Sequence, residues 1–263
     1  MAKADSDQAR PGKAGLDIRY QLEPQAEDRV KSTDSDSLAE IIAFLGSDLS
    51  KQAEKVPFFE EGARQVPAGV SESLYLFISR LKKQLNADEE HLLWQFASRL
   101  LNSNELSQEE RLNRAGFFAD WAVREILPLA LAESTLPDRF SAARLRHFAP
   151  ITDPESAEDA IDLVLQISAK SKKDALRPGS NPGSLKTSGS PAQTSAAIAA
   201  IAAYASSAAK SLVTRPGSYN CSWFAAVHAA NAANRAEAAG VNRETLIQMR
   251  IDLLDRICPA PAA

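Results

Sequence analysis

The chain contains few residues of the kinds that cross-link small folds or bind metals. Its 263 residues include two cysteines, Cys221 and Cys258, which exclude a disulfide framework and a four-cysteine zinc site. A single bridge between them would need an oxidising compartment, so the pattern favours two reduced thiols in a cytoplasmic protein. Aromatic residues make up only 6% of the chain, so Leu, Ile, Val and Ala must supply most of the core.

The sequence also lacks a dominant charge, a leader segment and a long, strongly apolar run. Lys and Arg total 30 against 34 Asp and Glu, and the net charge of -4 gives no strong signal for nucleic acid. The N-terminus has no apolar segment typical of a secretory signal. The most apolar stretch, residues 195–209, is mainly Ala and Ser, so we expect a packed helix and no membrane contact. The alanine content favours a bacterial source.

The sequence lacks the short motifs that are typical of common enzyme active sites. Neither of the glycine-rich phosphate loops, GxxxxGK[ST] and GxGxxG, occurs, and the serine elbow GxSxG is absent. Asp88 and His91 have a spacing that a metal could use, but the chain has no Glu-x-x-His motif for a carboxylate-bridged metal pair. Acidic side chains in a first helical turn are stabilised by the helix dipole, which explains this cluster better. We therefore predict no metal, no cofactor and no catalytic residue.

Apolar residues recur with helical spacing along most of the chain, and we find no convincing strand pairs, which predicts an all-α protein. Ser107 and Glu110 form a capping box at the start of the longest candidate helix. Pro128 should kink that helix or start a separate turn. Asp153, followed by a proline, and Asn242 are further predicted caps.

These patterns predict a single bundle of about eight helices. Residues 1–35 are polar and are expected to form a disordered arm, and residues 36–170 the main bundle. Residues 171–194, rich in Ser, Gly, Pro and Lys, are expected to form a flexible linker or long loop. Residues 195–258 are Ala-rich helices that either complete the bundle or form a small lobe. Completion is favoured, because three thin helices make a marginal core.

The most suggestive stretch is the helix that begins near Cys221. Asn220 is predicted to cap it, which would place Cys221 in the first turn, where a thiolate is favoured. On a helical wheel, His228, Asn231 and Arg235 share one arc of about 60°, with Cys221 close to it. Cys221 and His228 are about 10 Å apart along the axis, so they cannot exchange a proton directly.

Two interpretations of this polar arc remain open. It can form a polar seam against a neighbouring helix, or it can line a surface for a ligand or partner, comprising His228, Asn231, Arg235 and Cys221. A concave pocket that contains His228, Asn231 or Arg235 would favour the second interpretation.

The function that these features favour is a non-enzymatic helical module that binds another protein, as an adaptor, regulator or toxin-neutralising protein does. The alternative is an enzyme or small-ligand-binding protein with a pocket at the His228 helix. A third hypothesis is nucleic-acid binding through the basic linker, although the linker has no aromatic residues for base stacking.

Overall fold

Every regular element that the computed structural model describes is a helix, which confirms the all-α class. The structure describes residue 41, residue 66 and residues 69–101, 103–104, 107–134, 138–176, 190–218 and 220–259. The predicted arm, residues 1–35, lies outside the described residues, and so does most of the first part of the predicted main bundle, residues 36–68. Ile41, from that part, is helical and buried.

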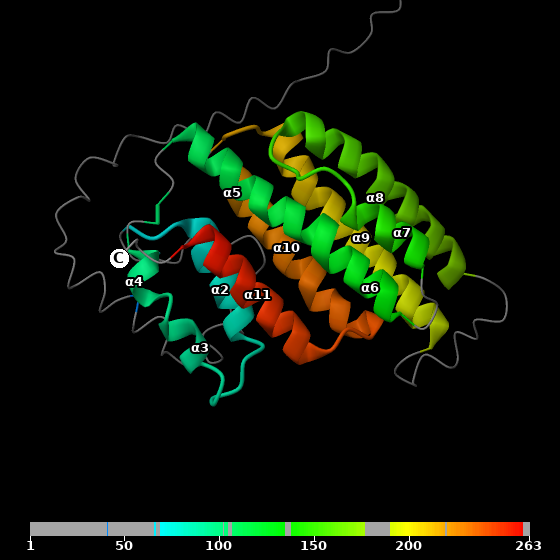
Figure 1. Cartoon of the computed structure of the whole chain (residues 1–263), viewed down its shortest axis with the longest axis horizontal. Helices are drawn as coiled ribbons and strands as arrows, with labels where there is room; N and C mark the ends of the chain where they lie inside the picture. Colours follow the sequence, from blue (N-terminus) through cyan, green and yellow to red (C-terminus); the bar gives the residue numbers. More distant parts are fainter. Residues whose placement is uncertain are drawn as a thin grey trace, which may run out of the picture. The chain divides into compact units, whose positions relative to one another are not determined.

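The helices pack as a bundle (Figure 1). In chain order they are α2 (Glu72–Lys82), α3 (His91–Trp94), α4 (Ala97–Leu100), α5 (Gln108–Trp121), the π-helix η4 (Ala122–Ile126), α6 (Leu127–Glu133), α7 (Arg139–Arg146), α8 (Pro154–Ala175), α9 (Pro191–Thr214), α10 (Cys221–Ala236), the 3-10 turn η6 (Glu237–Ala239) and α11 (Arg243–Ile257).

Three predicted helix starts are confirmed by their hydrogen bonds. The hydroxyl of Ser107 accepts from the main chain of Glu110, whose carboxylate accepts in return from the main chain of Ser107. Asp153 caps α8, and Asn242 accepts from the first main-chain donors of α11. Each side chain satisfies donors that the helix itself leaves unpaired, which is why these ends can be read from the sequence.

The segment before α5 is not one continuous helix, although Leu92, Phe96 and Leu100 recur there with helical spacing. The structure has two short helices, α3 and α4, and Phe96 lies between them. The main chain here bonds three residues back, as from Phe96 to Leu93. This tighter winding puts Leu93 and Phe96 on one line, so both are buried, while Trp94 is 62% exposed.

Pro128 does not end the long helix that begins at α5. Before the proline the helix widens into the π-helical turn η4, where the main chain of Leu127 donates to the oxygen of Ala122, five residues back. A proline lacks a donor and its ring crowds the carbonyl four residues back, so a locally wider turn accommodates it. The chain then continues as α6 to Glu133.

The core combines a small aromatic cluster with closely packed alanines. Phe77, Phe118 and Trp121 are buried and meet with ring centroids 5.2 and 5.6 Å apart. The alanine-rich part of the core lies where α9 packs against both α8 and α10, and α10 also packs against α2 and α5. Small residues permit this close approach, and the faces that meet here are largely alanine, with residues 225, 226, 229, 230, 232, 233 and 236 of α10 all buried.

Helix α9 is the one described helix that is long and apolar enough, by length and composition, to cross a membrane. Of its most apolar window, 61% is buried inside the protein, and the buried core helix of a soluble protein passes the same test. The finding is therefore weak evidence for a span. The helix begins at Pro191, and α8 continues to Ala175, so both helices extend into the predicted linker.

Glu89 ties the segment after α2 to the start of α11. Its carboxylate accepts two hydrogen bonds from the Arg243 guanidinium, at 2.8 and 2.5 Å, and Arg243 also donates to the main-chain oxygen of Gln84. The Arg243 hydrogen bonds, with a main-chain bond from Asn86, lower the pKa of Glu89 from 4.5 to about 2. The carboxylate therefore stays charged well into the acid range, and so this clamp, the ion pair between Glu89 and Arg243, persists there.

This clamp predicts a specific pH dependence for the variant Glu89→Gln. Because the pKa is lower in the folded protein, the ion pair stabilises fully above about pH 4.5, and its contribution is lost as the pH falls towards 2. Urea unfolding should therefore find the variant less stable than the wild type at pH 7 and closer to it at pH 3. A difference that does not shrink in acid, or one shared by the neighbouring variant Glu90→Gln, would contradict the assignment.

Candidate functional site

Helix α10 starts at Cys221 as predicted, but without the predicted cap. The side chain of Asn220 makes no capping hydrogen bond, and its backbone has helical angles (φ -91°, ψ 0°). The prediction was wrong because the main chain of Cys221 bonds to the oxygen of Ser218, so a turn leads directly into the helix. An N-cap residue normally has extended geometry, which Asn220 does not adopt.

The thiol of Cys221 lies in the interior. Cys221 is buried, it forms no disulfide, and its sulfur donates to the main-chain oxygen of Ser211 on α9 at 3.3 Å. Reactive thiols are partly exposed, so the fold gives Cys221 a packing role and removes it from the surface predicted with His228.

Asn231 belongs to a polar seam between α10, α2 and α11. Its amide oxygen accepts from the Arg80 guanidinium at 2.7 Å. One turn further along α10, the amide oxygen of Asn234 accepts from both Gln84, at 2.6 Å, and Arg250, at 2.8 Å. Arg250 also donates to the side-chain oxygen of Gln84. Hydrogen bonds of this kind are what buried polar groups require, so this half of the arc joins helices.

Arg235, the last residue of the predicted arc, is exposed near the end of α10. It is not among the residues that line the pocket described next. The four predicted site residues therefore separate: one is buried, one joins helices, one faces solvent, and His228 alone lines a pocket.

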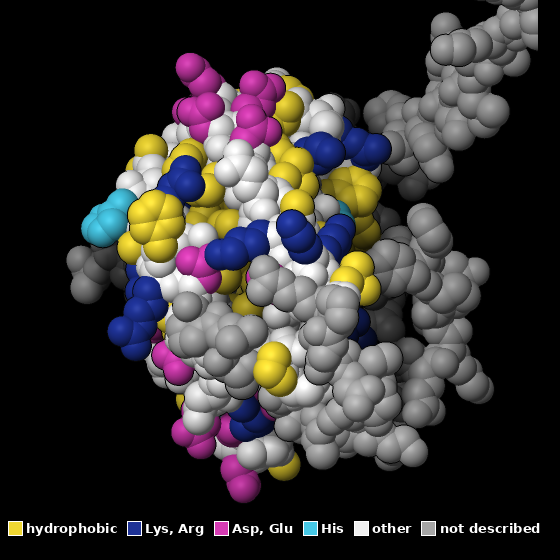
Figure 2. All heavy atoms as spheres, turned by 90° about the vertical axis from the view of Figure 1, so that its right-hand side faces the viewer, with side chains coloured by type: hydrophobic (Ala, Val, Ile, Leu, Met, Phe, Trp, Pro, Cys, Tyr) yellow, Lys and Arg dark blue, Asp and Glu magenta, His cyan; other side chains and the backbone are white. Residues whose placement is uncertain are grey.

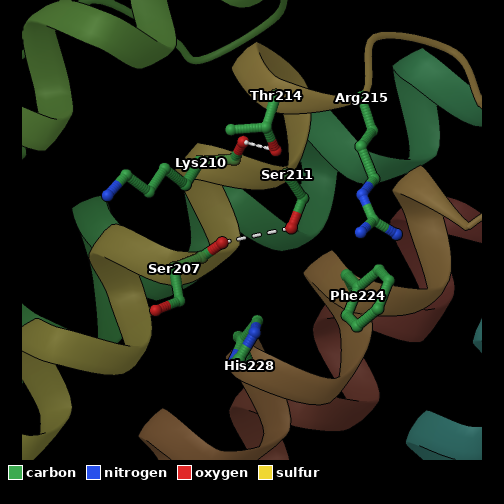
Figure 3. Close-up of a pocket in the computed structure, with 7 residues that line it drawn as sticks. All are labelled: Ser207, Lys210, Ser211, Thr214, Arg215, Phe224 and His228. Atoms are coloured by element: carbon green, nitrogen blue, oxygen red, sulfur yellow. Dashed lines mark hydrogen bonds between the residues drawn. The ribbon is translucent and has the colours of Figure 1, made fainter. Parts of the chain in front are cut away.

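His228 lies in an open pocket of about 240 Å³ between α9 and α10. Four turn-spaced residues of α9 form one wall, and Arg215, Phe224 and His228 form the other side (Figure 3). The lining residues are Ser207, Lys210, Ser211, Thr214, Arg215, Phe224 and His228.

The pocket is electropositive. Lys210 and Arg215 line it, and no Asp or Glu does so among the described residues. No ion pair within the described ranges involves either cation. The Arg215 guanidinium lies over the ring of Phe224, 4.9 Å from its centroid, which fixes one cation at the rim. Two cations that line an open hollow and have no ion-pair partner among the described residues raise the local concentration of anions.

The three hydroxyl groups in the wall have partners in their own helix. Ser207, Ser211 and Thr214 each donate to the main-chain oxygen four residues back, at 2.9, 3.1 and 2.8 Å. These carbonyls already accept helical bonds, so a hydroxyl can turn its proton towards a ligand at small cost. The wall therefore supplies both acceptors and rotatable donors beside the cations.

His228 completes the pocket as a neutral side chain. Its ring is stacked between Phe224 and Tyr204, with centroids 6.5 and 6.2 Å away. Burial and the nearby positive charge of Arg80 lower the pKa of His228 below its usual value. Nδ1 is buried and has no hydrogen-bond partner in the described part of the chain, so Nε2 is the ring nitrogen that can meet a ligand. An anion bound here would favour the protonated ring.

Comparison with known proteins supplies no relative. No protein-family model, no curated protein and no solved structure matches this chain. Among the described residues there is also no group of three or more His, Cys, Asp or Glu side chains that could hold a metal ion. The chemistry of the pocket is therefore the basis for assigning a function.

Proposed function

We propose that the protein is a binding module that takes an anionic group of a partner protein into the pocket between α9 and α10. The observation that carries this proposal is that Lys210 and Arg215 both line an open hollow to which no described residue contributes a carboxylate. Phosphate and carboxylate groups are the anions that such donors bind in proteins.

The size of the pocket favours a group on a larger molecule. Pockets that enclose a drug-sized ligand measure about 300–1,000 Å³ and bury most of the ligand's surface. This pocket, at about 240 Å³, is smaller and open to solvent. It has room for a phosphate or carboxylate at the end of a side chain, while the rest of the partner would lie across α9 and α10. A phosphate offers more oxygens than a carboxylate to Lys210, Arg215 and the hydroxyls, so it is the preferred probe.

The test compares a phosphoserine-containing peptide, its unphosphorylated form, free phosphoserine and inorganic phosphate by isothermal titration calorimetry. We expect the phosphopeptide to bind more tightly than the two small anions, and the unphosphorylated peptide most weakly. A charged hydrogen bond contributes about 1.5–3 kcal/mol, so Lys210→Ala and Arg215→Ala should each weaken phosphopeptide binding at least tenfold.

Lys83→Ala provides the matched control, because Lys83 is an exposed cation at the end of α2. Equal binding by the wild type and both pocket variants would refute the site. If free phosphoserine binds as tightly as the peptide, the ligand is a small molecule and the partner-protein half of the proposal fails.

A further inference from the structure

Helix α7 presents a row of planar side chains to solvent. Ala142 and Leu145 are buried and fix the inner side of this short helix. Phe140, Arg144 and His147 follow one another at spacings of four and three residues, so they lie on one outward face, and all three are exposed. Phe140 is 74% exposed, and the Arg144 guanidinium lies 5.9 Å from the centroid of its ring.

Cations surround this row on two helices. Arg139 and Arg146 are exposed at the two ends of α7. The ammonium of Lys170, on α8, pairs with the carboxylate of Asp138 at 2.5 Å, which brings the end of α8 beside the start of α7. Lys173 lies one turn further along α8. Figure 2 looks onto this end of the bundle, where Lys and Arg side chains form a band across the middle of the face.

The charge of this surface is opposite to that of the chain as a whole. Residues 138–147 and 170–176 together carry six Lys or Arg and two Asp, whereas the whole chain has a net charge of -4. One of the two acids, Asp138, is already paired with Lys170. A positive surface of this kind attracts polyanions, and added salt weakens that attraction.

The planar side chains decide which polyanion fits. Phe and His rings and the Arg guanidinium plane are the groups on which unpaired bases stack, and neighbouring cations hold the backbone phosphates. Insertion into a membrane is disfavoured, because Arg144 covers the ring of Phe140 and would have to enter with it. Duplex DNA keeps its bases paired and stacked, so the exposed ring of Phe140 would find no unpaired base on it.

We propose that the outward face of α7, together with the neighbouring end of α8, binds single-stranded nucleic acid. Phe140, Arg144 and His147 stack on bases, while Arg139, Arg146 and Lys173 contact phosphates. Residues 170–176 at the end of α8 include no aromatic residue, and the Lys170–Asp138 ion pair brings them beside Phe140 on α7. This site is separate from the pocket between α9 and α10, and neither proposal depends on the other.

The test measures fluorescence anisotropy of a labelled single-stranded DNA of about 16 nucleotides, the upper range of such sites. The wild type should bind it, and Phe140→Ala should weaken binding about tenfold, the loss expected for one stacked base. The logarithm of the binding constant should fall with the logarithm of salt concentration, and Arg139→Ala with Arg146→Ala should reduce that slope by about 1.4.

Trp94→Ala is the matched control for an exposed aromatic residue, and Lys83→Ala is the control for an exposed cation; both should bind like the wild type. Circular dichroism verifies that each variant stays folded. Absence of binding at low salt overturns the proposal, and so does unchanged binding by Phe140→Ala. Tighter binding to a duplex of the same length, or to vesicles of phosphatidylserine, would also overturn it in favour of another polyanion.

Discussion

Replacing Trp121 with alanine should lower the free energy of unfolding by about 3–5 kcal/mol, the usual cost of removing a buried Trp or Phe side chain. Trp121 is fully buried on α5, and its ring meets that of Phe77 edge to face, with centroids 5.6 Å apart. Phe77 in turn contacts Phe118. The substitution would leave a cavity where α2 meets α5, and close-packed helices cannot collapse fully into it.

The conservative variant Trp121→Phe separates packing from hydrogen bonding. The indole nitrogen of Trp121 is buried without a hydrogen-bond partner among the described residues, so replacing it costs no bond. We expect urea unfolding to show that Trp121→Phe lowers the free energy of unfolding by less than half as much as Trp121→Ala does. Equal losses for the two variants would mean that the indole nitrogen has a partner whose loss dominates the change in stability.

Replacing Arg250 with alanine should have the second large effect, a loss of about 3–5 kcal/mol. Arg250 is 1% exposed, and its guanidinium donates hydrogen bonds to the amide oxygens of Gln84 and Asn234. Asn234 keeps its hydrogen bond from Gln84, but the side-chain oxygen of Gln84 loses this donor, at about 1–3 kcal/mol, and the lost Arg side chain leaves a cavity. Burial also lowers the pKa of Arg250 to about 10, which reflects the cost of keeping this charge inside.

Arg250→Met tests whether the charge itself is unfavourable. Methionine keeps most of the packing of the Arg stem and removes the buried charge, which in the described residues has no carboxylate hydrogen-bonded to it. In urea unfolding, Arg250→Met should therefore lower the free energy of unfolding clearly less than Arg250→Ala does. A stability of Arg250→Ala within about 0.5 kcal/mol of the wild type would contradict a buried seam, because surface changes have effects of that size.

The local parts of the fold were predictable because their causes are local. The caps at Ser107, Asp153 and Asn242 each act within one helical turn. Asn220 failed as a cap, since a preceding turn already supplies the first main-chain bond. The π-helical turn before Pro128 also follows local physics, but the sequence alone does not distinguish it from a kink.

The division of the polar arc on α10 was not predictable. A helical wheel places His228 and Asn231 near one another, but it cannot say which helix packs against each. Asn231 meets Arg80, which is 151 residues earlier in the chain, while His228 faces α9. Such pairings arise from the tertiary arrangement, which places Asn231 between helices, His228 in the pocket and Arg235 in solvent.

A sequence signal for the other wall of the pocket was present but unused. Four polar residues follow the spacing i, i+3, i+4 and i+7, which makes one polar stripe on the second half of an Ala-rich helix: Ser207, Lys210, Ser211 and Thr214. Together with the basic residue Arg215 just beyond the helix, this stripe could have identified a polar surface on α9. Its meeting with His228 still required the structure.

The pKa of His228, measured by NMR with and without the phosphopeptide, tests the central proposal most directly. The chain has three histidines, and His91, which belongs to neither proposed site, serves as the internal reference. In the free protein the pKa of His228 should lie below its usual value, and saturating phosphopeptide should raise it, because a nearby anion stabilises the protonated ring. The ring signals of His91 should not move when the phosphopeptide is added. An unchanged pKa of His228 in a protein that binds the phosphopeptide would place the anion elsewhere and contradict the proposed pocket.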